Sequence, residues 1–101
     1  MAIHELKGVE MGQSGESIDF VSGVLLESEL DGNKHYDLTL KNVVQYDLFY
    51  DYQQKEELVE VKITTINDQT AKAQMEVRTV NKRDPDDNVI ELVTTNPIEL
   101  S

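Results

Sequence analysis

A strict alternation of apolar and polar residues over positions 36–52 constrains this chain more than any other feature of its sequence. Eight of the nine even positions in this run are apolar or aromatic, and most odd positions are polar. A period of two is typical of a β-strand with one buried face. A straight strand of this length would extend about 56 Å, whereas a domain of about 100 residues has a radius of gyration of about 13 Å. We therefore expect the strand to curl around a core, or to break near Asn42 and Val43, where asparagine interrupts the apolar face.

The same period recurs along the rest of the chain, which predicts an all-β or mostly β fold with little helix. The further alternating segments are 18–30, 59–65, 73–79 and 89–95. Five to six antiparallel strands with meander connections, closed into a small barrel or strongly curled sheet, account for this pattern. We expect residues 1–101 to form a single domain.

Within that domain we expect an antiparallel core over residues 18–95, preceded by an irregular segment over 1–17 and followed by a tail over 96–101. Three glycines in the first segment argue against a long helix there. Its scattered apolar residues would also allow an edge strand to begin within it. Asn96 and Pro97 end the last strand, because proline donates no ladder hydrogen bond.

The sequence DGNK, residues 31–34, is predicted to turn the chain between two strands. Its Asp-Gly pair suggests a two-residue loop. Such a loop would pair even positions with odd ones, whereas the apolar residues on both sides occupy even positions. We therefore expect a three-residue loop over 31–33, with Leu26 opposite Leu38.

Charge predicts the register of the later hairpin, which turns at the sequence NDQT. Pairing Ile63 with Met75 keeps the apolar faces together and places Lys62 opposite Glu76. Opposite charges across two strands contribute about 0.2–1 kcal/mol per pair. This register implies a five-residue loop over 67–71.

Acidic side chains outnumber basic ones by 20 to 9, so the net charge is −11. Nucleic acids and anionic membranes attract basic proteins, and we expect this chain to bind neither directly. A partner protein, or a second copy of the chain, is expected instead. The charge is also compatible with an acidic inhibitor that mimics nucleic acid and binds a basic protein, although lysines interleave with the carboxylates throughout.

Residues that commonly carry chemistry are scarce. The chain has no cysteine, which excludes disulfides, thiolate metal ligands and a cysteine nucleophile. His4 and His35 have no sequence-local partner that would fix either ring for acid–base work. Asp84, Asp86 and Asp87 lack the glycine and the regular spacing of a calcium loop. We therefore expect no catalytic residue, no cofactor and no metal site.

Features that would direct the chain to a membrane or out of the cell are not expected. The first residues show no basic start followed by an apolar stretch, as a secretory signal would. No apolar run approaches the roughly 20 residues of a membrane-spanning helix. Together with the lack of cysteine, these features predict a cytoplasmic, intracellular protein.

Aromatic residues near position 50 give the strongest candidate surfaces. All four tyrosines occupy even positions and are expected to share one face, either as a core wall or as a binding surface. They are Tyr36, Tyr46, Tyr50 and Tyr52. Phe49 occupies the opposite face between Asp47 and Asp51, where alternation predicts solvent. An exposed phenylalanine indicates burial against another segment or subunit. Val43 and Val93 share its parity, and we interpret these five residues as a candidate interaction surface.

The preferred functional interpretation is a non-enzymatic acidic β-domain that binds protein or acts as a structural subunit and self-associates through this surface. A barrel that binds a small molecule between its tyrosines is a further alternative. Acyl-thioester "hot-dog" enzyme domains have hairpins similar to ELVEVKITTIND…AKAQMEVRTVN. Their long central helix is poorly matched by residues 1–17, so no family is assigned.

Overall fold

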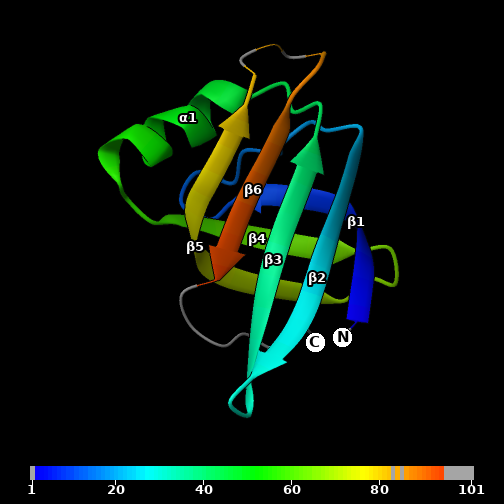
Figure 1. Ribbon diagram of the computed structural model, residues 1–101. Coiled ribbons are helices and arrows are strands. Elements are labelled where there is room, and N and C mark those ends of the chain that lie inside the picture. The colour runs from blue at the N-terminus through cyan, green and yellow to red at the C-terminus, as the bar shows by residue number, and fades with distance from the viewer. Residues whose placement is uncertain (1, 83, 85, 95–101) are drawn as a thin grey trace.

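A computed structural model describes residues 2–82, 84 and 86–94 (Figure 1). Its elements are β1 (Ala2–Met11), β2 (Ser22–Leu30), β3 (Asn33–Lys41), α1 (Tyr46–Lys55), β4 (Val59–Thr65), β5 (Thr70–Asn81) and β6 (Val89–Thr94). The strands form a closed barrel in the order β1-β2-β3-β6-β5-β4, and all pairs are antiparallel. The prediction of a small antiparallel barrel with meander connections and little helix is confirmed.

Two three-stranded meanders make up the barrel, and α1 carries the chain from the first to the second. β3 pairs with β6 and β1 pairs with β4, which closes the ring. Figure 1 shows α1 outside the barrel, beside β5. Pairing of strands between two copies of the chain would require a free strand edge. In the closed barrel each described strand has a paired neighbour on both sides over at least part of its length.

Apolar side chains from all six strands and from α1 fill the interior. The largest fully buried side chains are Phe49, Leu25, Leu38, Leu40, Ile63, Met75, Ile90, Leu92, Val9, Val43, Val59 and Val61. In β4 and β6 the buried positions alternate as the sequence predicts, with Ile90, Leu92 and Thr94 on one face. Within the described residues, no helix has the length and apolar character needed to cross a membrane.

The expectation that residues 1–17 are irregular is wrong for β1. This strand pairs first with β2 and then with β4, and its register shifts between Leu6 and Gly8. The shift reverses which parity faces inward, so Leu6, Val9 and Met11 are all buried although they do not alternate. A bulge therefore conceals the strand from a search for period two. The predicted tail over 96–101 lies outside the described residues.

The three-residue loop predicted over 31–33 is also wrong. Leu30 pairs with Asn33 across the two residues Asp31 and Gly32. Both have positive φ angles, 54° and 81°. Left-handed backbone at both positions is the requirement of a type I′ hairpin turn, which Asp-Gly satisfies well.

This turn places Leu25, rather than Leu26, opposite Leu38. Leu25 is fully buried, whereas Val24 and Leu26 lie on the outer face of the barrel. The error arises because β2 begins at Ser22, so Ile18 and Phe20, whose even parity was extended to Val24 and Leu26, lie outside the strand. Two apolar residues that we assigned to the core are therefore on the surface.

The register predicted for β4 and β5 is wrong by four residues. Ile63 lies opposite Ala71, and Met75 lies opposite Val59, so Lys62 faces another lysine instead of a glutamate. Both Met75 and Val59 are almost completely buried. A shift of four residues keeps the same side chains in the core, so the turn decides the register. The N–H of Thr65 donates to the carbonyl of Gln69, and Asp68 has a positive φ of 65°, so the chain turns two residues earlier than predicted.

The break predicted near Asn42 and Val43 is confirmed, because β3 ends at Lys41 and Asn42 adopts a positive φ of 56°. The strand does not resume afterwards. Residues Tyr46–Lys55 form α1 instead, and Phe49 is the buried residue of this helix. The alternation over the second half of 36–52 therefore does not report a strand.

Candidate functional site

The five residues predicted to form an interaction surface do not lie on one surface. Phe49 and Val43 are fully buried in the chain's own core. Asp47 and Asp51 are exposed on α1, and Val93 is half-buried on β6. The exposure predicted for Phe49 followed from strand parity, which does not apply to a helix. Of the three apolar members, only Val93 remains accessible.

The four tyrosines do not share one face. Tyr36 is buried on β3, where its backbone N–H donates a 3.1 Å hydrogen bond to Oγ1 of Thr94. Tyr46, Tyr50 and Tyr52 are half-buried on α1, and Tyr46 and Tyr52 pack against the core. Three of the four belong to the helix, so their even numbering no longer places them together.

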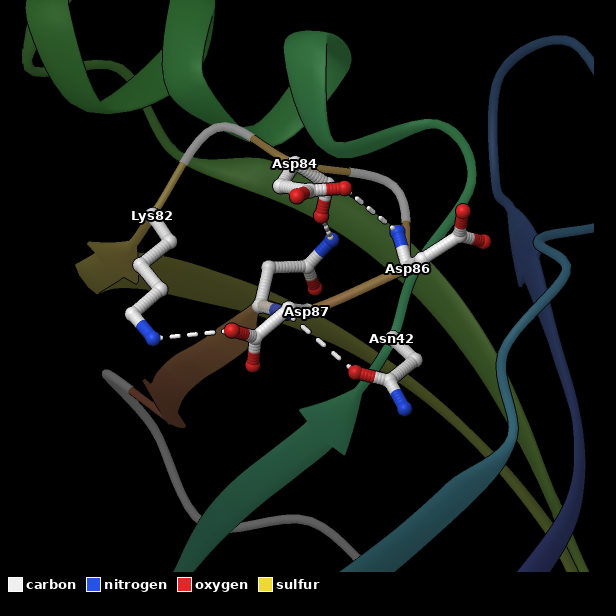
Figure 2. Close-up of polar contacts among 6 residues, drawn as sticks. Asn42, Lys82, Asp84, Asp86 and Asp87 are labelled. Atoms are coloured by element: carbon white, nitrogen blue, oxygen red, sulfur yellow. Dashed lines mark hydrogen bonds and ion pairs between the residues drawn. The ribbon is translucent and has the colours of Figure 1, made fainter.

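The acidic loop between β5 and β6 does not gather its carboxylates. Figure 2 shows the side chain of Asp86 pointing away from those of Asp84 and Asp87. Oδ1 of Asp84 accepts a hydrogen bond from the backbone of Asp86 at 3.0 Å, and Asp87 accepts one from Lys82 at 2.8 Å. Within the described residues, no three acidic or histidine side chains are arranged to hold a metal ion.

Asn88 holds this loop against the end of β3. Its side chain is almost completely buried, and its Oδ1 accepts a 2.9 Å hydrogen bond from the backbone N–H of Val43. Its Nδ2 donates to the carbonyl oxygens of Val43, at 2.9 Å, and Asp84, at 2.7 Å. Asn42 adds a reciprocal pair of bonds with the backbone of Asn88. Asn88 is therefore a structural residue that links two distant segments.

His4 has a partner that the sequence does not reveal, because Glu27 lies 23 residues away on the neighbouring strand. Nε2 of His4 is 3.5 Å from Oε2 of Glu27, and Nζ of Lys34 is 3.1 Å from the other carboxylate oxygen. The hydrogen bond from Lys34, followed by that from His4, lowers the pKa of Glu27 below its ordinary 4.5. The three side chains form an ion-pair cluster across β1, β2 and β3.

This cluster predicts a pH dependence of stability. The pKa of Glu27 is lower in the folded chain, so its charge stabilises the fold above about pH 4.5, and that contribution is lost as the pH falls through the lowered value. The Tm of the wild type, measured by circular dichroism, should therefore fall more steeply between about pH 5 and pH 3 than that of Glu27→Gln. Glu10→Gln, which removes an exposed carboxylate, should keep the wild-type slope. Equal slopes for all three proteins would contradict a stabilising role for the cluster.

Outward-facing apolar side chains gather on one wall of the barrel. Ile3 lies opposite Leu26, Leu26 opposite Asp37, and Asp37 opposite Val93, so one row crosses four neighbouring strands. Val24 lies beside this row on β2. Ile3 is 67% exposed and Val24 is 37% exposed. We call Ile3, Val24, Leu26 and Val93 the outer patch.

The outer patch lines a groove of about 450 Å³. Asp37 and Glu91 line the groove as exposed carboxylates, and Arg78 contributes its one cationic side chain. Thr39 lies between Val24 and Glu91 on the neighbouring strands. Figure 1 shows β2, β3 and β6 side by side on this wall. The groove thus combines apolar side chains with charged ones, and Asp37 lies within the patch between Leu26 and Val93. Protein-binding surfaces combine apolar and polar side chains in this way.

Comparison with known protein families, with curated proteins and with solved structures finds no match to this chain. A barrel fold by itself does not identify an activity, because one fold supports many unrelated functions. Function is therefore inferred from the outer patch and its charged border.

Most of the outer patch was missed from the sequence. Val24 and Leu26 were assigned to the core because their even parity matched that of the preceding strand residues. Ile3 was placed in a segment without a defined face. Val93 was identified as a surface residue, since it is apolar and alternates with the residues of its strand that were expected to face the core. An apolar residue at a strand position that should face solvent is thus the signal that finds this surface, provided that the inward and outward positions of the strand are assigned correctly.

Proposed function

We propose that this chain is a non-enzymatic, acidic β-barrel that binds a partner protein through the outer patch inside the cell. The observation that carries the proposal is the cluster of accessible apolar side chains on one wall of the barrel, contributed by β1, β2 and β6, with the exposed carboxylate of Asp37 between Leu26 and Val93. Apolar side chains that face water together mark interaction sites. The lack of cysteine supports a reducing compartment.

The dimensions of the outer patch fit an amphipathic helix. From Ile3 to Val93 the row crosses three interstrand spacings, or about 14 Å. Val24 and Leu26 add a width of two residues along β2, about 7 Å. The apolar stripe of a three-turn helix is about 16 Å long, so such a helix laid across the strands would cover the patch, in the manner of helix-in-groove recognition.

Charge favours a basic partner over a second copy of the chain. Asp37 lies within the patch and Glu91 beside it, and the whole chain carries a charge of −11. Two copies would bring like charges together, whereas lysine or arginine residues beside the apolar stripe of a helix would be attracted. Self-association, which the sequence favoured, also relied on Phe49 and Val43, and both are buried. The acidic-inhibitor hypothesis shares this class of partner.

A small-molecule site inside the barrel is not proposed. The interior is occupied by core side chains from every strand, and the tyrosines that were expected to line a cavity are distributed between β3 and α1. The surface of the barrel is therefore the better-supported place for recognition.

The proposal predicts binding of a helical basic peptide. A synthetic peptide of about 14 residues, with leucines at helical spacing and lysines elsewhere, serves as the probe. Isothermal titration calorimetry should show binding that Ile3→Ser/Val24→Ser weakens at least about tenfold, since two apolar contacts are lost. Both positions are partly or largely exposed, so the fold should tolerate the substitutions.

The matched control is Val21→Ser/Val44→Ser, which removes two exposed valines outside the patch without changing charge. This variant should bind the helical peptide as the wild type does. If neither variant weakened binding, attraction by the net charge rather than the outer patch would hold the peptide. Equal weakening in both variants would show that binding is not confined to the outer patch.

A further inference from the structure

β5 changes its partner halfway along its length. From Thr70 to Met75 it pairs with β4, and from Met75 to Asn81 it pairs with β6. In the described part of the chain, the second half of β5 therefore has a paired strand on one side alone. α1 lies along the other side (Figure 1). This half of β5 is a local strand edge within a barrel that is otherwise closed.

Gln53 of α1 supplies a hydrogen bond to this edge. Its Nε2 donates to the backbone carbonyl of Arg78 at 2.8 Å. In a sheet, a carbonyl at this position would accept from the backbone N–H of the next strand. The side chain of Gln53 thus takes the place of one donor of an absent strand. Arg78 lies at the register shift between Val77 and Thr79, which leaves its carbonyl directed toward the helix.

A groove of about 620 Å³ lies between α1 and this edge. Its volume is within the range of about 300–1,000 Å³ that ligand pockets have. Leu58 is an apolar contact at its border and is 45% exposed. Glu56, Glu57 and Glu76 line it together with Arg78, so exposed carboxylates outnumber cations by three to one.

We propose that this groove binds an extended segment of a partner protein, with alternating basic and apolar residues, as a strand added to β5. Backbone hydrogen bonds to a strand edge supply affinity in such complexes, and contacts to alternate side chains supply specificity. The carboxylates of Glu57 and Glu76 would attract lysine or arginine, and Leu58 would contact an apolar residue. The last turn of α1, which carries Gln53, moves aside and leaves the Arg78 carbonyl to the incoming backbone N–H. This groove adjoins the outer patch, because Arg78 lines both grooves and Glu76 lies opposite Val93, but none of the four outer-patch side chains lines it.

The experiment uses the full chain and a peptide of about 14 residues in which leucine and lysine alternate. Fluorescence anisotropy should show binding, and N-methylation of the peptide at alternate backbone nitrogens should weaken it about tenfold or more, because strand pairing is lost. Gln53→Ala should tighten binding about fivefold, since no side chain then competes for the Arg78 carbonyl. A merely electrostatic attraction would not respond to either change.

The groove carboxylates are tested by Glu57→Gln/Glu76→Gln, which should weaken binding about tenfold. Asp47→Asn/Asp51→Asn removes the same number of charges from the exposed side of α1 and should have a much smaller effect. No binding, unchanged binding of the N-methylated peptide, or equal effects of the two double variants would overturn the proposal.

Failure of this proposal is distinguishable from failure of the proposed function. Ile3→Ser/Val24→Ser should leave binding of the alternating peptide unchanged. Loss of that binding in this variant would move the peptide to the outer patch and overturn the assignment to β5. A wild-type dimer in solution that Gln53→Ala strengthens would also overturn it, because a second copy rather than a basic segment would then occupy the edge.

Discussion

Phe49→Ala should lower the free energy of unfolding by about 3–5 kcal/mol, the usual cost of removing a buried aromatic side chain. Phe49 is fully buried and is the one buried residue of α1. Ten residues are too few for a stable isolated helix, and Gln45 makes no side-chain capping hydrogen bond, so α1 depends on its packing against the barrel. The substitution would leave a cavity and release α1 from the barrel. Urea denaturation followed by circular dichroism measures the change.

Gln54→Ala is the matched control, because Gln54 is exposed on the same helix. Its effect should stay within about 0.5 kcal/mol. If Phe49→Ala instead kept wild-type stability and changed the native mass, Phe49 would belong to a subunit interface after all. Burial within the chain would then be wrong.

Asn88→Ala should cost about 2–4 kcal/mol, because it removes three side-chain hydrogen bonds between buried or partly buried groups. The N–H and carbonyl of Val43 would lose their partners at a fully buried position. The loop after β5 would also lose its attachment to the end of β3. The change in the urea midpoint at constant slope gives the loss of stability.

Asn88→Asp separates the hydrogen bonds of Asn88. It keeps the oxygen that accepts from Val43 but loses both donors to carbonyl oxygens. Its stability should therefore lie below the wild type, since a carboxylate would face two carbonyls. Asp86→Ala, at an exposed loop position, should be nearly neutral. An Asn88→Ala variant as stable as Asp86→Ala would exclude the structural role.

The strands were predictable from the sequence where every second side chain is buried along the whole strand. β4 and β6 have this pattern, and their buried positions follow it. The pattern fails where a strand has a bulge or where the alternation is carried across residues that are not in the strand. The bulge beside Gly8 concealed β1. β2 begins at Ser22, so the parity of Ile18 and Phe20 gave the wrong faces for Val24 and Leu26.

α1 was mistaken for a strand because its aromatic residues fit two periods at once. Tyr46, Tyr50 and Tyr52 alternate by number, yet Phe49 lies at helical spacing from both Tyr46 and Tyr52. The alternation predicted that Phe49 is exposed, and this improbable result was the sign that the strand pattern had ended before Phe49. Asn42, with its positive φ, marks the point of change.

The candidate sites depended on pairings between distant segments. Glu27 beside His4, and Asn88 beside Val43, bring together residues that are 23 and 45 positions apart. The outer patch requires the correct register of β1, β2, β3 and β6. An error of one residue in β2 exchanges its inner and outer faces, so this surface could not be predicted while the turn at residues 31–32 was misassigned.

The most direct test of the proposed function is a map of where the helical leucine–lysine peptide binds, from its effect on backbone amide chemical shifts of the labelled chain. We predict that the largest shifts cluster at residues 3–5, 24–26, 37–39 and 91–93, which form adjacent parts of four strands. Shifts that cluster instead on the loops near Val21 and Val44, or that spread evenly over the acidic surface, would contradict the outer patch as the binding surface.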